Sequence, residues 1–305
     1  MDETRARAVR RVLLGTLALN AVVAGSKIAY GHYSNALSIQ ADGFHSLTDS
    51  TNNLVGLSGV YLASRPADSG HPYGHQKFEI LAAGAVGLSL LAMAFDVLRS
   101  AYQRFTHPVS NPTHTSALAF IVLTATLAVN LFVAQYERRR GEELSSPFLL
   151  SDATHTRSDV LVTLGVLVTV ALVQLGHPEL DAITAVGIGG FIAWAGIGVL
   201  RTNLSYLADA AAIDANEVAR VVLKVPGVAS THKIRTRGPP GAIHVDLHIQ
   251  IARHLDVTRA HRVTHWVIEA IKAELPGVAD VLVHTEPARP DQSYNPLPDE
   301  PSTDG

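Results

Sequence analysis

Cysteine is absent from this chain, and charged residues make up only 17% of its 305 positions. Without thiols the protein can form neither a disulfide framework nor a thiolate metal site, so soft-metal chemistry must use imidazole and carboxylate groups. Its net charge of −3 does not indicate the basic surface that binds nucleic acid. A phosphate loop of the GxxxxGK(S/T) type is also absent, which argues against a nucleotide as the energy source.

Long apolar segments dominate the first two thirds of the chain. Hydrophobic residues account for 47% of the sequence and the mean hydropathy is +0.19, which favours a membrane part joined to a water-soluble part. Four apolar runs of roughly 20 residues can cross a bilayer. They cover about 12–30, 78–98, 116–136 and 183–200. A shorter run at 160–175, extended back to 147, and the more polar segment 36–63 would raise the number of spans to six.

The distribution of Lys and Arg decides whether these two polar segments count as spans, because cytoplasmic loops carry an excess of both residues. Six spans with the N-terminus in the cytoplasm leave only Arg99 and Arg104 at the outer ends. The ten basic residues at the cytoplasmic ends are then Arg5, Arg7, Arg10, Arg11, Arg65, Lys77, Arg138, Arg139, Arg140 and Arg201. Four spans would put seven inside and five outside, so we predict a six-helix transmembrane bundle over 1–208.

A different pattern begins after about residue 209. In order, the segments read as an amphipathic helix at 214–228, strands at 228–237 and 242–251, a helix with an apolar stripe over 260–271, and a strand at 277–287. The second strand alternates strictly, with His244, Asp246 and His248 opposite its apolar face. The order αββαβ predicts a small α+β domain over 209–288. The tail 289–305, rich in Pro, Asp and Ser, is predicted to be disordered.

Two of the expected spans repeat one arrangement of an imidazole and a carboxylate. The stretch SIQADGFHSLTDSTNN carries His45 and Asp49, and DATHTRSDVLV carries His155 and Asp159. Residues four apart share a helix face, so two such helices can offer two nitrogens and two oxygens around one point. That set suits a tetrahedral Zn²⁺ ion. Helix caps or a buried hydrogen-bond network are the alternative, but a central Asp costs about 3 kcal/mol on insertion scales and usually marks a functional pathway.

Further acidic and histidine residues accompany these pairs. Asp42 and Asp152 each lie one turn before a His of the pairs, where they could orient the imidazoles or line a solvated cavity. The loop RPADSGHPYGHQKFE brings Asp68, His71 and His75 within eight residues of one another. These three side chains could bind a metal ion at the cytoplasmic surface, although an ordinary solvated loop can have the same composition.

The motifs ADGFHSLTD, RPADSGHPYGHQKFE and HTRSD, in this order, resemble the cation diffusion facilitator family of divalent-metal efflux transporters. The resemblance covers about 10–288. It implies a homodimer of six-span protomers with a metallochaperone-like domain in the cytoplasm. It also implies exchange of a divalent metal for protons, without enzymatic activity. Because the chain is compact and lacks a transit segment or a long His-rich insertion, we expect a bacterial-type plasma membrane, with both termini on its cytoplasmic side. The two His–Asp pairs match the family's transport site, and the Asp-His-His loop matches its loop site.

The resemblance also implies roles in and near the C-terminal domain. The residues that match the family's regulatory site, which is expected to be binuclear and close to the dimer interface, are His232, His248, His261, His284 and Glu286. Glu286 stands where some members have Asp, which keeps the carboxylate and lengthens its reach. Lys77 and Asp209 resemble a pair that locks the dimer near the cytoplasmic surface. The remaining histidines of the domain, His244, His254 and His265, have no such match and are expected at the surface.

The expected metal is Zn²⁺, both transported and bound at the regulatory site, because the two His–Asp pairs resemble zinc-type or zinc/iron-type members. Fe²⁺, Mn²⁺, Co²⁺ and Cd²⁺ stay open, since affinity order alone does not confer selectivity. We expect metal/proton antiport with alternating access, in which protons displace the metal from neutral imidazoles. A non-transporting metal sensor or scaffold subunit is the main rival. An intramembrane metallohydrolase is another, but it needs an open metal position, and HExxH is absent.

Overall fold

The computed structural model describes residues 3–33, 37–106, 117–174, 180–289, 292–293 and 297. The chain divides into two compact units, Met1–Leu204 and Ser205–Gly305. Each unit is described by itself below.

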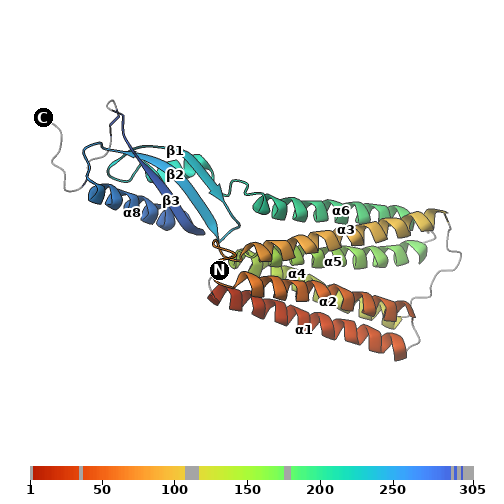
Figure 1. Ribbon diagram of the computed structural model, residues 1–305. Helices are drawn as coiled ribbons and strands as arrows, with labels where there is room; N and C mark the ends of the chain where they lie inside the picture. The colour runs from red at the N-terminus through yellow and green to blue at the C-terminus, as the bar shows by residue number, and fades with distance from the viewer. Residues whose placement is uncertain are drawn as a thin grey trace. The chain divides into compact units, whose positions relative to one another are not determined.

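Long helices make up the first unit (Figure 1). In the described ranges they are α1 (Glu3–Tyr33), α2 (Leu37–Ala63), α3 (Lys77–Thr106), α4 (Ala117–Glu143), α5 (Pro147–Gln174) and α6 (Leu180–Leu207). Each has 27 to 31 residues, which at about 1.5 Å per residue is long enough to cross a bilayer. Over the described residues, α1, α3 and α6 are also apolar enough to qualify as spans by composition. The helical character of the unit is confirmed, whereas six crossings stay a prediction.

Small residues let α2 approach its neighbours closely. A Cβ added at Gly56 would lie 2.2 Å from the ring of Phe148 on α5, and one at Gly59 would lie 2.5 Å from Cβ of Ala82 on α3. Close approach of this kind is how helices pack where lipid supplies no hydrophobic drive between them. Phe148 is fully buried in a core that also includes Leu13 of α1.

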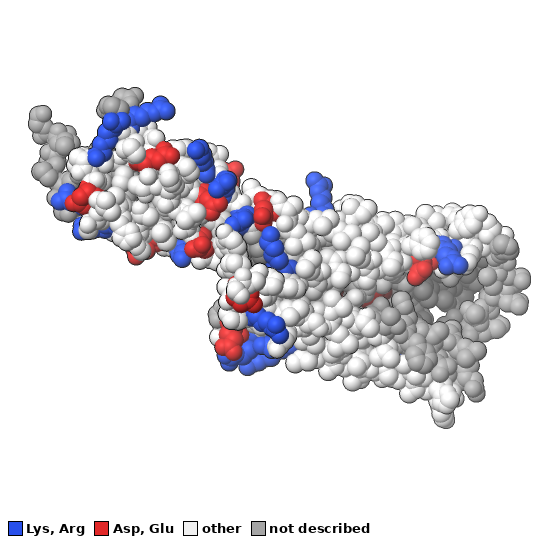
Figure 2. Space-filling model, in the orientation of Figure 1, with Lys and Arg blue, Asp and Glu red and all other residues white. Residues whose placement is uncertain are grey.

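The outer surface of this unit is apolar. Large side chains that are more than half exposed include Val22 on α1, Leu88 on α3, Phe132 on α4 and Trp194 on α6. On the face shown in Figure 2, charged side chains of the unit lie toward its two ends and its middle is nearly uncharged. An apolar belt between charged ends is the surface expected of a helical unit that sits in a bilayer.

A network around the ion pair of Arg5 and Glu79 joins the ends of four helices. Arg5 Nη1 on α1 donates to Glu79 Oε2 on α3 at 3.1 Å, and the side chain of Glu79 is only 4% exposed. Arg5 also donates to the carbonyl oxygens of Leu144 and Ser145, at 2.6 and 2.8 Å, in the turn between α4 and α5. Ser146 Oγ donates to the second oxygen of Glu79. The starts of α1, α3 and α5 and the end of α4 are therefore held together at one end of the unit.

The second unit has the element order αββαβ that the sequence predicts. Its elements are α7 (Ala215–Val222), β1 (Val228–Arg237), β2 (Ile243–Ile251), α8 (Val257–Glu274) and β3 (Val278–Pro287). The sheet is mixed, in the order β1-β2-β3, with β1 antiparallel and β3 parallel to β2. Asp214 and Asp256 cap the two helices by accepting bonds from backbone N–H groups, which explains where both helices begin.

Both helices cover the apolar face of the sheet. Buried and less buried residues alternate along β2 without a break, as the sequence predicts. Val245 and Leu247 of β2 share one core with Val218 of α7 and with Val263 and Val267 of α8. The histidines of β2 therefore lie on the opposite face of the sheet, away from both helices.

Candidate metal sites

A small polar cavity lies among α1, α2, α4 and α5. Its volume is about 30 Å³, which is large enough to hold a water molecule. The residues that line it are Asn20, Val23, Ser46, Asn53, Asn130, Asp152, His155, Thr156 and Asp159. All but one of these carry polar side chains, in a unit whose outer surface is apolar. Polar groups gathered inside such a unit mark a candidate functional site.

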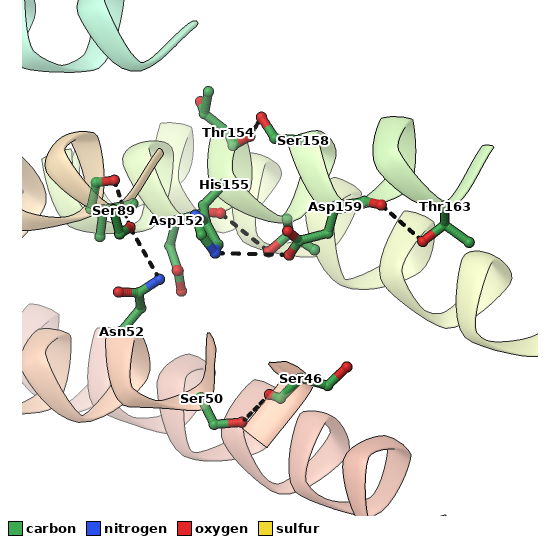
Figure 3. A network of polar contacts seen from close by, with 12 residues as sticks. Ser46, Ser50, Asn52, Ser89, Asp152, Thr154, His155, Ser158, Asp159 and Thr163 are labelled. Atoms are coloured by element: carbon green, nitrogen blue, oxygen red, sulfur yellow. Dashed lines mark hydrogen bonds and ion pairs between the residues drawn. The ribbon is translucent and has the colours of Figure 1, made fainter. Parts of the chain in front are cut away.

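His155 and Asp159 come together on this cavity. The imidazole is almost fully buried, and its Nε2 lies 3.9 Å from Asp159 Oδ2, one turn further along α5. Figure 3 shows both side chains, with Asp152, on the side of α5 that points toward Ser50 and Asn52 of α2. The helical spacing predicted from the sequence is therefore present, and one imidazole and one carboxylate face the same point.

The matching residues of α2 can be reported only by position. The backbone of α2 is helical at 42, 45 and 49, but the side chains of Asp42, His45 and Asp49 lie outside the described residues. Their neighbour Ser46 and, one turn beyond Asp49, Asn53 both line the cavity. Whether the two His–Asp pairs meet is therefore a prediction.

A buried lysine on α1 is a residue that the sequence analysis missed. Lys27 is 4% exposed, and its Nζ donates to Ser46 Oγ at 3.0 Å. Its ammonium group thus lies beside the α2 residue that follows His45. A Lys within an otherwise apolar run, in the stretch AGSKIAYG, was the available signal, because such a residue is costly in a span and usually has a local partner.

Asp152 pairs with a second residue that the sequence analysis missed, Glu137 on α4. Both side chains are buried, at 3% and 0% exposure, and the two carboxyl groups interact directly. Thr156 Oγ1 donates to Glu137 Oε2 at 3.3 Å. His155 also acts electrostatically on Asp152, but no hydrogen bond joins the two side chains in the described part of the chain. That Asp152 orients the imidazole of His155 therefore stays a prediction. Glu137 stands beside three arginines in YERRR and reads as an ordinary helix end.

The loop between α2 and α3 assembles Asp68, His71 and His75. One ligand atom from each lies within 4.8 Å of the others. Asp68 Oδ1 is 3.4 Å from His71 Nδ1, and Asp68 Oδ2 is 3.3 Å from His75 Nε2. His75 Nδ1 is 3.0 Å from the carbonyl oxygen of Pro66, which can only accept, so Nδ1 donates there and Nε2 is the nitrogen turned toward Asp68.

Backbone groups prepare the carboxylate of this loop for a cation. The N–H groups of His71 and Gly70 donate to Asp68 Oδ1 at 2.7 and 2.9 Å. The bond from His71 is the main cause of the lowered pKa of Asp68, which keeps the group ionised. A charged carboxylate and two adjacent imidazoles supply the oxygen and nitrogen ligands that Zn²⁺ takes in proteins.

The open face of the sheet in the second unit holds a cluster of three candidate ligands. His232, His248 and Glu286 each offer an atom within 4.8 Å of the others. His248 Nδ1 is 2.8 Å from Glu286 Oε1, and His232 Nε2 is 3.3 Å from Glu286 Oε2. The hydrogen bond from His248 is the main cause of the lowered pKa of Glu286. His284 stands beside the cluster, with its ring centroid 4.4 Å from that of His248.

Strand register explains why these residues meet although they are far apart in sequence. His232 of β1 is paired with His248 of β2, and His248 is paired with His284 of β3. Three adjacent strands thus present an imidazole at one level, and Glu286 follows His284 by two on the same face.

His261 does not join this cluster within one chain. It is exposed on α8, where its ring lies 4.5 Å from that of His265. Since α8 covers the apolar face of the sheet and the cluster occupies the other face, one chain cannot bring them together. The expected five-residue site is therefore only partly assembled in a single chain.

The expected pair of Lys77 and Asp209 is divided between the two units. Lys77 is the first residue of α3 and is exposed. Asp209 has a φ of 54° and its Oδ2 lies 3.6 Å from Arg237 Nη1. The pairing of Lys77 with Asp209 stays a prediction.

Buried imidazole and carboxylate groups inside an apolar-surfaced helical unit point to a membrane protein that handles metal ions. Comparison of sequences narrows the class. Residues 13–208 match the family model described as the cation efflux transmembrane domain, and 210–288 match that of the cation efflux protein cytoplasmic domain. The chain belongs to the cation efflux family, as the motifs predicted. Members of this family are membrane transporters of divalent metals and not enzymes.

Relatives match along nearly the whole chain. An uncharacterised transporter of Methanocaldococcus jannaschii is 29% identical over 282 residues, covering 92% of this chain and 99% of its own. Metal tolerance protein 2 of Oryza sativa subsp. japonica is 29% identical, covering 95% of this chain and 81% of its own. The cation-efflux pump FieF of Salmonella schwarzengrund is 28% identical, covering 94% and 95%.

Two of the similar solved structures are of an isolated C-terminal domain. A mutant of the MamM C-terminal domain is 21% identical, covers 27% of this chain and 91% of its own, and gives a TM-score of 0.24. A manganese form of the same domain is 22% identical, covers 24% of this chain and 92% of its own, and gives a TM-score of 0.23. The family assignment rests on the sequence matches.

Proposed function

We propose that this protein exports a divalent metal ion through the cavity on which His155 and Asp159 meet. The observation that supports this function best is a buried imidazole 3.9 Å from a carboxylate on a polar cavity within an apolar-surfaced unit. Lipid-facing helices keep such groups inside only where a pathway or a site compensates their cost. A cargo ion with nitrogen and oxygen ligands fits both the groups and the cavity.

The second half of the proposed site comes from α2. Position 49 follows Ser46 by three residues and precedes Asn53 by four, so on a helix all three positions share one face. Ser46 and Asn53 line the cavity. We therefore assign His45 and Asp49 as the other two ligands, which gives two imidazoles and two carboxylates.

The proposed cycle is metal/proton antiport with alternating access. Metal binds from the cytoplasm while both imidazoles are neutral, because a protonated imidazole cannot ligate. When the cavity opens outward, protons compete for the same nitrogens, whose unperturbed pKa of about 6.5 lies in the physiological range. The proton-loaded site then returns. Differential affinity of metal and protons for the two states is sufficient to drive the exchange.

Zn²⁺ is the proposed cargo, with Fe²⁺ as the first alternative. Two nitrogens and two oxygens in a closed set are typical of tetrahedral Zn²⁺. The same ligand types also bind Fe²⁺, Mn²⁺, Co²⁺ and Cd²⁺, so selectivity among these ions depends on the geometry of the site. Transport assays that compare the ions measure this selectivity.

We propose that the protein lies in the plasma membrane. Its chain crosses this membrane six times, and both termini are in the cytoplasm. The Arg5 network supports this topology, because it gathers the start of α1, the start of α3 and the α4–α5 turn at one end. The arginines of α1 and the run Arg138–Arg140 lie near this end, and a concentration of basic residues favours the cytoplasmic side.

A homodimer is the proposed assembly, and the second unit is its proposed regulatory domain. The cluster of His232, His248 and Glu286 offers an incomplete set of ligands within one chain, to which His284 can add a fourth. We propose that His261 contributes from the partner chain, and that metal bound here tightens the dimer. The loop group of Asp68, His71 and His75 is proposed as a further cytoplasmic binding site. We also propose that Lys77 and Asp209 pair near the dimer's cytoplasmic surface.

Metal uptake into proteoliposomes with an imposed pH gradient tests the function. Zn²⁺, Fe²⁺, Mn²⁺, Co²⁺ and Cd²⁺ are compared in the wild type, in Asp159→Asn, and in Asp96→Asn as a matched control on the exposed side of α3. We expect Zn²⁺ flux that follows the gradient, is lost in Asp159→Asn and persists in Asp96→Asn. Zn²⁺ binding by folded wild-type protein without flux of any metal would contradict the proposal and favour the sensor or scaffold.

A further inference from the structure

Two carboxyl groups that the proposed transport site does not use are buried against each other. Glu137 is 0% and Asp152 3% exposed, and their side chains interact directly. They meet because α4 and α5 are joined by a short turn, closed by the bond from Ser146 N to the carbonyl oxygen of Gly141, and run back along each other. The pair lies on the same flank of α5 as the cavity, since Asp152 also lines it.

Among the described residues, His155 acts electrostatically on Asp152, but no Lys or Arg compensates this pair. Glu137 Oε1 and Asp152 Oδ2 are both buried and accept no hydrogen bond in the described part of the chain. Two carboxylates cannot stay charged side by side in a medium of low dielectric without a counter-charge. Either a shared proton or a bound cation has to neutralise them, and the two open oxygen atoms are placed to bind a cation.

The surrounding groups are oxygen ligands. Thr156 Oγ1 is 3.3 Å from Glu137 Oε2 and 3.2 Å from the carbonyl oxygen of Asp152. Thr16 of α1 bonds to the same glutamate, and its Oγ1 is also 3.3 Å from Asn53 Oδ1. An all-oxygen set of two carboxylates and hydroxyl groups suits a hard divalent cation, in contrast to the mixed nitrogen and oxygen set of the transport site.

We propose that Glu137 and Asp152 form a second divalent-cation site, one helical turn from the His155–Asp159 pair. Asp152 precedes His155 by three residues, which is about 4.5 Å along the helix axis. It lies on the side of the α4–α5 turn, where the basic residues gather. Its place on a cytoplasmic route to the transport site rests on the proposed function, whereas cation binding by the pair does not.

The number of ions bound tests this site directly. Full-length protein in nanodiscs is dialysed against Mn²⁺, chosen because it favours oxygen ligands, and the bound metal is counted by atomic absorption. The matched control is Glu142→Gln, which removes an exposed carboxylate of the same helix that pairs with Arg138. We expect Glu137→Gln/Asp152→Asn to bind one Mn²⁺ fewer per chain than either the wild type or the control. Equal counts in the three proteins would overturn the proposal.

Thermal unfolding separates a cation site from a purely structural acid pair. Without metal, the isosteric variant Glu137→Gln should melt no lower than the wild type, because it removes one of two uncompensated charges. Added Mn²⁺ should then raise the melting temperature of the wild type more than that of Glu137→Gln. A variant that melts lower without metal and shows the same Mn²⁺ response as the wild type would overturn the cation site. The two carboxyl groups of Glu137 and Asp152 would then be joined by a shared proton.

The two proposals fail separately. Asp159→Asn, which is expected to abolish flux, should keep the Mn²⁺ ion that Glu137→Gln/Asp152→Asn loses. A wild type without flux but with this difference in count would refute the transport proposal and support the second site. Normal flux with no difference in count would refute the second site alone.

Discussion

Replacing Arg5 with Leu tests the network that joins the ends of four helices. Arg5 Nη1 lies 3.1 Å from Glu79 Oε2, and the glutamate side chain is 4% exposed. Arg5→Leu leaves this carboxylate buried without its cation and removes the donors to the carbonyl oxygens of Leu144 and Ser145. Breaking a buried pair from one side costs about 3–5 kcal/mol, and since Arg5 is 21% exposed we expect the lower end, about 3 kcal/mol.

Reversible unfolding in mixed micelles, followed by circular dichroism, measures this loss. The control is Arg7→Leu on the same helix, whose pair with Glu3 spans 2.9 Å but has side chains that are 56% and 74% exposed. Exposed pairs contribute about 0–1 kcal/mol, so the control should lose little. Adding Glu79→Gln to Arg5→Leu should recover part of the loss, because it removes the stranded charge. Equal losses in Arg5→Leu and Arg7→Leu would refute the reasoning.

Two further predictions concern packing and pH. Gly56→Ala should destabilise the helical unit by about 1–3 kcal/mol, because the new Cβ would lie 2.2 Å from the ring of Phe148; Gly15→Ala, with no atom within 4 Å, should not, and equal unfolding free energies would show that α2 and α5 are further apart. The lowered pKa of Glu286, caused mainly by the bond from His248, means that this contact stabilises the folded chain at neutral pH and is lost as the pH falls below the ordinary value of 4.5. Glu286→Gln should therefore lower the melting temperature at pH 7 and lose that effect in acid, and a difference that persists unchanged in acid would contradict the assignment.

The sequence predicts most of the second unit because its signals are local. Strict alternation from Ile243 to Ile251 identifies the core face of β2, and the burial pattern follows it without a break. Burial of a face depends mainly on period, and period is visible in a single sequence.

The polar interior of the first unit is harder to predict. The spacing of His155 and Asp159 identifies one half of the candidate site, because it repeats in a second segment. Lys27 and Glu137 were missed for a physical reason. Their burial depends on which helices pack around them, and Glu137 looks in sequence like a charge at a solvated helix end.

The separation of His261 from the cluster within one chain has a similar origin, and its part in the site stays a prediction. His261 was grouped with His232 and His248 by resemblance, yet it lies on a helix that covers the opposite face of the sheet. Sequence spacing cannot tell which face of a sheet a later helix will cover. Only the packing of α8 on Val245 and Leu247 makes this visible.

The most direct test of the central claim records Zn²⁺ and protons in the same vesicles. Wild-type protein and His155→Ala are reconstituted with a zinc-sensitive dye and a pH-sensitive dye inside, and Zn²⁺ is added outside. We predict that Zn²⁺ entry and proton exit occur together in the wild type and disappear together in His155→Ala, while the variant keeps its helical content. Coupled fluxes that persist in His155→Ala would contradict the assignment of this cavity as the transport site.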